Sequence, residues 1–192
     1  MEHLSTAELE AGVGAVRRSP SELGTVELIV RRPAVGEREV LAEATLAAQA
    51  GLIGDTWPVR ASSRTADRSP HPDMQLTVMN SRAALLVAGD PARRMLAGDQ
   101  LYVDLDLSPV NLPGGTRLAV GSAVIEVTDQ PHLGCAKFGA RFGQDAWRFV
   151  NSGAGRALRL RGLNARVVTT GTVRTGDVIR KLPARSAAAS RP

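Results

Sequence analysis

Short runs of alternating apolar and polar residues, separated by glycine-rich turns, constrain this chain more than any other feature. The first begins at "GTVELIVRRP", where Val26, Leu28 and Val30 share one face. Similar runs lie at 39–47, 74–79, 101–107, 116–129 and 164–181. A period of two is typical of half-buried β-strands. Turns such as "LPGGT", "AVGSA" and "TTGTVRTGD" are closely spaced, which favours a closed or nearly closed β-barrel over an open parallel sheet.

Helical patterns are short and peripheral. Residues 5–18 have the capping-box spacing of Ser5 and Glu8 and an apolar face, so they predict an N-terminal helix. Further helical candidates are 81–89, 90–98 and "GQDAWRFVNS" after the only cysteine. Residues 58–73 have no apolar period and predict a long loop. We therefore expect a mostly β fold with a few short peripheral α-helices, divided into a helical appendage (1–22), a barrel domain (23–182) and a disordered tail (183–192).

Composition excludes several classes of protein. With one cysteine and three histidines in 192 residues, the chain can form neither an internal disulfide nor a Cys-x-x-Cys pair, and a zinc site is poorly supported. The sequence lacks a P-loop, a G-x-S-x-G motif and a G-x-G-x-x-G motif. The N-terminus has no signal-peptide core, and no run approaches the ~20 apolar residues of a membrane span. We expect a soluble, cytoplasmic protein without a membrane partner.

The positive charge is concentrated in one segment. The formal net charge is +5, and 22 of the 24 basic residues are arginine. Residues 137–166 contain seven basic residues and only one acidic residue, Asp145. Aromatic residues make up 3% of the chain, so the stacking platforms of single-strand nucleic-acid binders are scarce. The segment suits a small anionic ligand at least as well as a nucleic acid.

The segment "QPHLGCAKFGARFG" contains the only cysteine, Cys135, between a strand predicted to end near Asp129 and a helix predicted to begin near Gln144. His132, Lys137 and Arg141 are close enough in sequence to favour the thiolate, the form that attacks sulfur or binds a soft metal. Most free cysteines, however, pack as small hydrophobic side chains. Sequence context alone leaves both interpretations of Cys135 open.

Other polar candidates have ordinary structural explanations beside the functional ones. "GLIGDTW" presents Asp55 on a tight turn, and the following loop contains Arg60, Arg64 and Arg68, whose guanidinium groups match phosphate oxygens. These arginines could equally be solvated charges on a mobile loop. Asn111 precedes a Pro-Gly-Gly turn, where asparagine is common for local backbone reasons.

The order of these pieces resembles the MOSC domain, the module named after the C-terminal part of molybdenum-cofactor sulfurases. The matching pieces are "GLIGD", "MQLTVMNSRAALLVAG", "AGDQLYVDLDLS" with "NLPGGTRLAVGSAVIEVT", "PHLGCAKF" and "GLNARVVTTGTVRTGDVI". The resemblance covers residues 24–181. It implies a β-barrel with an essential cysteine, linked to molybdenum-cofactor handling in sulfur transfer or reduction.

The resemblance also implies site residues. Cys135 matches the family's cysteine, as catalytic thiol and metal ligand. The residues that would bind the molybdenum cofactor (molybdopterin) are Asp55, Arg60, Arg64, Gln100, Asn111, His132, Lys137 and Arg141. Gln100 stands where the family's Gly-Glu-Asn-Leu segment has asparagine. Pyridoxal phosphate binding is only an association of the family. The chain has no room for the desulfurase domain of the sulfurases, so a donor of sulfur or electrons would be another protein.

Three hypotheses follow. The first is an enzyme or sulfur carrier that binds a molybdopterin-type cofactor through Cys135. The second is a cofactor-free module that binds a small anion or metabolite, with Cys135 structural. The third, ranked last, is a nucleic-acid-binding protein that uses residues 137–166.

Overall fold

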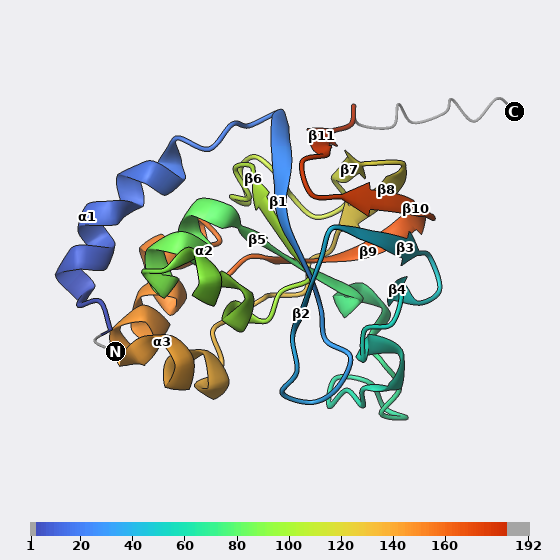
Figure 1. Ribbon diagram of the computed structural model, residues 1–192, viewed down its shortest axis with the longest axis horizontal. Helices are drawn as coiled ribbons and strands as arrows, with labels where there is room; N and C mark the ends of the chain where they lie inside the picture. Colours follow the sequence, from blue (N-terminus) through green and yellow to red (C-terminus); the bar gives the residue numbers. More distant parts are fainter. Residues whose placement is uncertain (1–2, 184–192) are drawn as a thin grey trace, which may run out of the picture.

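The computed structural model describes residues 3–183, and Figure 1 shows strands gathered on one side of the molecule and helices on the other. The predicted tail from residue 184 onward lies outside the described residues. The strands are β1 (Leu23–Arg31), β2 (Glu39–Leu41), β3 (Glu43–Ala47), β4 (Gly51–Leu52), β5 (Leu76–Asn80), β6 (Leu101–Asp104), β7 (Arg117–Val120), β8 (Ala123–Val127), β9 (Leu163–Thr169), β10 (Gly171–Arg174) and β11 (Val178–Lys181).

Seven strands close into a barrel, as the sequence predicted. Their order is β11-β7-β8-β9-β5-β6-β1, and β11 pairs back onto β1 through Leu23–Thr25. All of these pairs are antiparallel except β5–β6, which is parallel. Apolar residues on alternate positions, such as Leu101 and Val103 of β6, are fully buried in the barrel core. Closure leaves no unpaired edge within the barrel itself.

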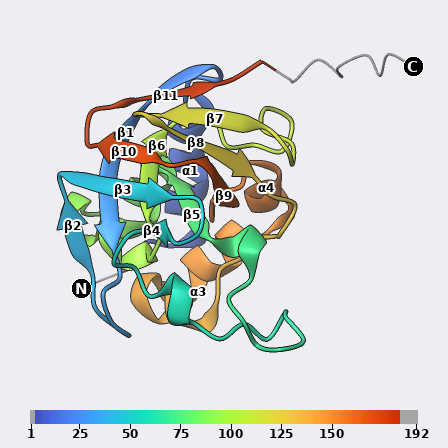
Figure 2. The same cartoon turned by 90° about the vertical axis from the view of Figure 1, so that its right-hand side faces the viewer.

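A second, three-stranded sheet with the order β10-β3-β4 lies beside the barrel. Figure 2 shows β3 beside β10, with β11 and β7 above them and α3 below. Ala44, Leu46 and Val173 from this sheet join the barrel core. The continuous strand predicted over 39–47 is therefore divided: β2 extends the barrel sheet from β1, whereas β3 belongs to the small sheet.

The helices cover the outer face of β1, β5 and β6 (Figure 1). The α-helices are α1 (Thr6–Arg17), α2 (Ser81–Ala88), α3 (Ala136–Asn151) and α4 (Gly153–Ala157), and 3₁₀-helices span Trp57–Val59, Pro72–Met74 and Pro91–Ala97. Met79 and Tyr102 point away from the barrel core and form a second core with α1, α2 and α3. These strands are therefore buried on both faces, as expected where helices pack on a sheet.

Local sequence explains the helix ends. Ser5 and Glu8 form the predicted capping box at the start of α1. Gly89, in the left-handed conformation, ends α2. The helix predicted over 90–98 is a 3₁₀-helix that starts at Pro91 and ends at Gly98, which has φ +89°. No helix in residues 3–183 is long and apolar enough to cross a membrane.

Candidate functional site

Cys135 is an exposed residue at the N-cap position of α3. The helix predicted from near Gln144 is confirmed as the second part of α3, but the prediction missed the part before it, because α3 already begins at Ala136. It continues through a kink at Gly143, where φ is 91° and ψ is 162°. Because Gly143 interrupts the helix, the apolar periodicity does not continue across it, and the turns before Gly143 were not predicted. Cys135 consequently lies directly at a helix end instead of in the middle of a loop.

The segment before Cys135 is held on two sides. The His132 Nε2 lies 2.8 Å from the Asp99 Oδ1 on the barrel side. The Gly134 carbonyl accepts hydrogen bonds from Trp147 Nε1 at 2.8 Å and Asn151 Nδ2 at 3.0 Å, both on α3. Cys135 is thereby fixed between the barrel and α3.

Asp99 is a fully buried carboxylate shared by two partners. Besides His132, it accepts a 2.5 Å hydrogen bond from Arg161 Nη1. Burial alone would raise the pKa of Asp99, but the charges and hydrogen bonds of Arg161 and His132 together outweigh burial and hold this pKa at about 2. Burial, reinforced by Arg161, lowers the pKa of His132 below its usual value. Asp99 is thus paired with the Arg161 guanidinium and has His132 as its second hydrogen-bond partner.

Asp55 is the second buried carboxylate of this region. Its side chain pairs with Arg32 through Nε at 2.8 Å and Nη2 at 2.7 Å, a bidentate geometry. It also accepts a hydrogen bond from the Trp57 backbone N–H at 3.0 Å. Arg32 in turn donates to the Gly98 carbonyl at 3.2 Å, next to Asp99. The structure therefore brings Asp55 close to the Cys135 segment, but its oxygens are committed to protein donors.

Gln100 is also committed to the fold. Its Oε1 accepts from the Thr77 backbone N–H at 2.8 Å and the Thr77 hydroxyl at 2.6 Å, and the residue is fully buried. Its Nε2 lies 3.5 Å from Asp55 Oδ1 and from the Gln75 carbonyl. The Gln100 side-chain amide thus bonds to β5 at one end and lies near the Asp55 turn at the other.

Two further arginines surround Gly98. A side-chain Cβ at Gly98 would lie 3.2 Å from Arg38 Nη2 and 3.7 Å from Arg141 Nη1. Arg141 Nη1 also donates to the Leu96 carbonyl at 2.6 Å. Burial, followed by the positive charges of Arg141 and Arg32, lowers the pKa of Arg38. We call Arg32, Arg38 and Arg141 the Gly98 arginine cluster.

The Gly98 arginine cluster has unused capacity for an anion. The Arg38 Nε is buried and has no hydrogen-bond partner in the described part of the chain. The nearby carboxylates do not compensate Arg38 and Arg141, because Asp55 pairs with Arg32 and Asp99 pairs with Arg161. Clustered guanidinium groups without matching carboxylates attract phosphate and similar oxyanions. Of the three, sequence reasoning found Arg141 and missed Arg32 and Arg38, which lie over 90 residues away and have no motif of their own.

The remaining predicted residues lie in different places. Lys137 and Arg60 are exposed. Arg64 donates to the Gln130 side chain at 3.0 Å, which joins the 58–73 loop to the segment before Cys135. Asn111 does not join this region. Its amide donates to the Ser21 and Asp106 carbonyls and accepts from Lys181, so it holds the β6–β7 turn against β11.

Residues 3–183 contain no group of three or more His, Cys, Asp or Glu side chains arranged to hold a metal ion.

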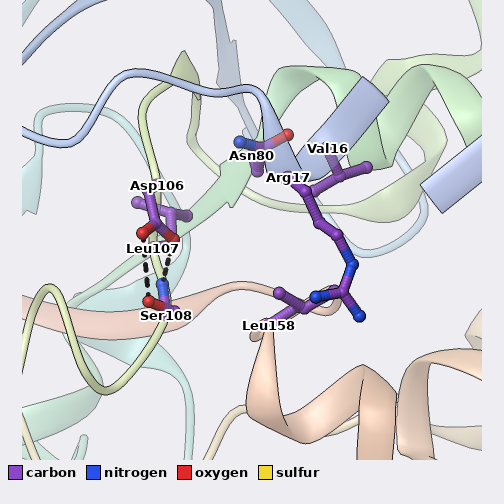
Figure 3. Close-up of a pocket in the computed structure, with 7 residues that line it drawn as sticks. All are labelled: Val16, Arg17, Asn80, Asp106, Leu107, Ser108 and Leu158. Carbon is purple, nitrogen blue, oxygen red and sulfur yellow. Dashed lines mark hydrogen bonds between the residues drawn. The ribbon is translucent and has the colours of Figure 1, made fainter. Parts of the chain in front are cut away.

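A separate cavity of about 170 Å³ lies between the end of α1, the 106–108 turn and Leu158 (Figure 3). Three of its polar side chains, Asn80, Asp106 and Ser108, bond within the protein. Asp106 accepts hydrogen bonds from the Ser108 backbone N–H and hydroxyl, and Asn80 donates to Ser19 and the Leu105 carbonyl. We therefore assign this cavity no part in the candidate site.

Comparison with known proteins identifies relatives of the whole fold. The model of the MOSC domain family matches residues 58–180. YuaD from Bacillus subtilis is 17% identical, covers 82% of this chain and 94% of its own, and has a TM-score of 0.56. YiiM from Geobacillus stearothermophilus is 15% identical, covers 83% and 75%, and has a TM-score of 0.56.

YiiM from Escherichia coli is 22% identical, covers 84% of this chain and 71% of its own, and has a TM-score of 0.54. At these identities the likeness shows a shared fold. A search of curated proteins found no match.

Proposed function

Because the chain belongs to the MOSC domain family, we propose that it binds a molybdopterin-type cofactor at the Gly98 arginine cluster and acts through the Cys135 thiolate. The family is associated with sulfur transfer and reduction that involve the molybdenum cofactor. The single observation that carries the proposal is the link between the exposed Cys135 and the arginines around Gly98: Cys135 follows His132 by three residues, and His132 is bonded to Asp99, which follows Gly98.

The residues present fit such a cofactor. Its phosphate is anionic, and Arg38 and Arg141 offer guanidinium groups around a glycine that leaves their approach open. The orphaned Arg38 Nε is a further donor. His132 is hydrogen-bonded to Asp99, and Cys135 follows three residues later, within about 10 Å of chain length. A phosphate at the arginines and a metal at the thiol can therefore belong to one molecule.

Each side chain has a distinct task in this proposal. Arg38 and Arg141 bind and orient the phosphate, and Arg32 keeps Asp55 from repelling it. The Asp99–His132 hydrogen bond and the α3 contacts of Gly134 set the position of Cys135. When bound, the cofactor supplies redox chemistry at its metal.

Cys135 has two alternative roles, and both require its thiolate. As a metal ligand, it anchors the cofactor. As a carrier, its thiolate attacks the outer sulfur of a donor persulfide, so that a Cys135 persulfide forms and the donor thiolate leaves. The donor of sulfur or electrons would be a separate protein.

The decisive experiment is expression in a host that makes the cofactor, followed by metal analysis and intact mass of the purified protein. If Cys135 is a ligand, native protein contains molybdenum and Cys135→Ala does not. If Cys135 is a carrier, native protein gains a sulfur adduct that Cys135→Ala lacks. Arg38→Gln lowers the cofactor content in either case, whereas the control Arg174→Gln, an exposed arginine paired with Glu43, does not. Equally negligible metal and no adduct in both native protein and Cys135→Ala would refute the proposal.

The two alternatives from the sequence have less support. A structural cysteine is expected to be buried, whereas Cys135 is exposed. Two arginines of the basic segment 137–166 are paired with carboxylates within the protein, Arg161 with Asp99 and Arg166 with Glu126. This engagement weakens the argument for nucleic acid, which rested on their free charge.

A further inference from the structure

A recess of about 220 Å³ opens between the 128–133 segment, α4 and the start of β9. His132 forms part of its wall, so the recess adjoins the segment that positions Cys135. Leu133, Val150 and Leu163 contribute apolar surface, and three arginines contribute charge. We call it the Arg159 recess after the central one of these arginines.

The charged side chains that line the Arg159 recess have one positive charge in excess. Arg161 is balanced by Asp99. Arg156 and Arg159 face a single carboxylate in the lining, Asp129. The Asp129 carboxylate lies against the 113–115 turn, since a Cβ at Gly114 would sit 1.9 Å from its Oδ1. The recess can therefore accept one anionic group without an unpaired charge remaining.

Arg161 supplies a buried donor that the protein does not use. Its side chain is 7% exposed; Nη1 binds Asp99 and Nη2 donates to the Ala97 carbonyl at 3.0 Å. Its Nε is buried and without a hydrogen-bond partner among residues 3–183. Buried donors are almost always satisfied in folded proteins, so an unsatisfied one in the wall of a recess points to a ligand.

Arg159 is held by the end of α4. Its φ is +45°, and the backbone N–H groups of Arg159 and Leu160 donate to the Arg156 and Gly155 carbonyls, the common left-handed cap of a helix C-terminus. Its Nη1 donates to the Leu112 carbonyl at 2.7 Å and the Leu107 carbonyl at 3.3 Å. The helix end and these two hydrogen bonds fix the position of this arginine at the recess.

We propose that the Arg159 recess binds a small molecule with an apolar body and a single carboxylate group. An apolar cavity of about 150 Å³ holds one benzene molecule. A recess of about 220 Å³ therefore suits a benzene-sized body with one additional small group. The carboxylate pairs with both Arg156 and Arg159, the Arg161 Nε offers a further donor, and the body packs on Leu133, Val150 and Leu163.

Leu133 in the recess wall lies two residues before Cys135 in the chain, and His132, also in the wall, is bonded to Asp99. We assign the bound molecule as the substrate of the Cys135 site. This assignment rests on the proposed function, whereas binding at the recess does not.

The test is isothermal titration of purified native protein with benzoate and with benzamide, which has nearly the same shape and no charge. Benzoate binds at least about tenfold more tightly, because one charge-assisted hydrogen bond is lost with the amide. Arg156→Gln, at an exposed position, weakens benzoate binding by about tenfold and leaves the fold intact. Arg159→Gly has the same effect and relieves the positive φ. Arg180→Gln, which removes an exposed charge on β11, leaves binding unchanged.

Three results would overturn the recess proposal. They are equal affinities for benzoate and benzamide, equal affinities for inorganic phosphate and benzoate, and binding that Arg156→Gln and Arg159→Gly leave unaltered. Cys135→Ala separates the two proposals, because it changes metal or sulfur content and not benzoate affinity. Benzoate binding in a protein that takes up neither metal nor sulfur supports the recess and contradicts the proposed function.

Discussion

At the scale of single residues, Asp99 organises the candidate site. It is fully buried and sits between His132 and Arg161, which come from chain positions 33 and 62 residues away. A buried carboxylate without a counter-charge is costly, so Asp99 ties the Cys135 segment and the start of β9 to the Gly98 turn. The same contacts place His132 in a low-dielectric environment next to a guanidinium group.

The environment of His132 predicts a pH dependence of stability. Burial, followed by the Arg161 charge, lowers its pKa in the folded protein below 6.5. The unfolded chain therefore takes up a proton more readily as the pH falls through 6.5. The free energy of unfolding decreases in that direction and is fully retained above this range.

His132→Gln keeps a side-chain donor for Asp99 and removes the titration. Urea unfolding at about pH 8 and about pH 5.5 measures the difference. We expect the native protein to lose more stability than His132→Gln between these values, and equal losses would contradict the assignment.

At the scale of elements, glycines decide where the chain can bend or approach another strand. Gly162 begins the turn into β9 with φ +97°, and a Cβ there would lie 2.2 Å from the Val78 carbonyl oxygen of β5. Gly176, in the turn before β11, has φ +93° but no atom within 4 Å of a Cβ. Both positions have a positive φ, but only a Cβ at Gly162 would clash with a neighbouring atom.

Alanine at each position separates these two effects. Gly176→Ala lowers the free energy of unfolding by about 1 kcal/mol, the cost of a positive φ. Gly162→Ala lowers it by about 1–3 kcal/mol more, because β9 must move away from β5. Chemical denaturation of both variants measures the difference. Similar losses for both would show that the β5–β9 approach tolerates a methyl group.

At the scale of the whole molecule, closure of the barrel depends on a contact between its first and last strands. β11 pairs with β7 on one side and with β1 on the other. Ile179 of β11 is fully buried in the barrel core, whereas its neighbour Val178 is 52% exposed. In the same barrel, β9 lies between β8 and β5, and its first residue, Leu163, forms part of the wall of the Arg159 recess.

Truncation of these two neighbours tests closure. Ile179→Ala lowers the free energy of unfolding by about 2–5 kcal/mol and speeds amide exchange at Leu23–Thr25, which pair with β11. Val178→Ala changes stability by less than about 0.5 kcal/mol. If amide exchange at β1 is the same in both variants, closure does not depend on Ile179.

The sequence by itself determined the elements that depend on local geometry. Alternation of apolar side chains predicts strands because successive residues face opposite sides, and Ser5 with Glu8 predicts the start of α1 because a capping box is local. The collinear motifs also identified the family. Where glycine interrupted a pattern, as at Gly143 of α3, the same reasoning found the helix after the glycine and missed the part before it.

Only the tertiary structure decided which side chains meet at the Gly98 turn and at the segment before Cys135. Gln100 was predicted to contact a ligand but is buried against Thr77, and Asn111 faces β11, whereas Arg32 and Arg38 converge on Gly98 from the other end of the barrel domain. These contacts join residues tens of positions apart, and their geometry follows from strand register and barrel closure. Periodicity records which face of a strand is buried, but it carries no information about which distant charge lies opposite.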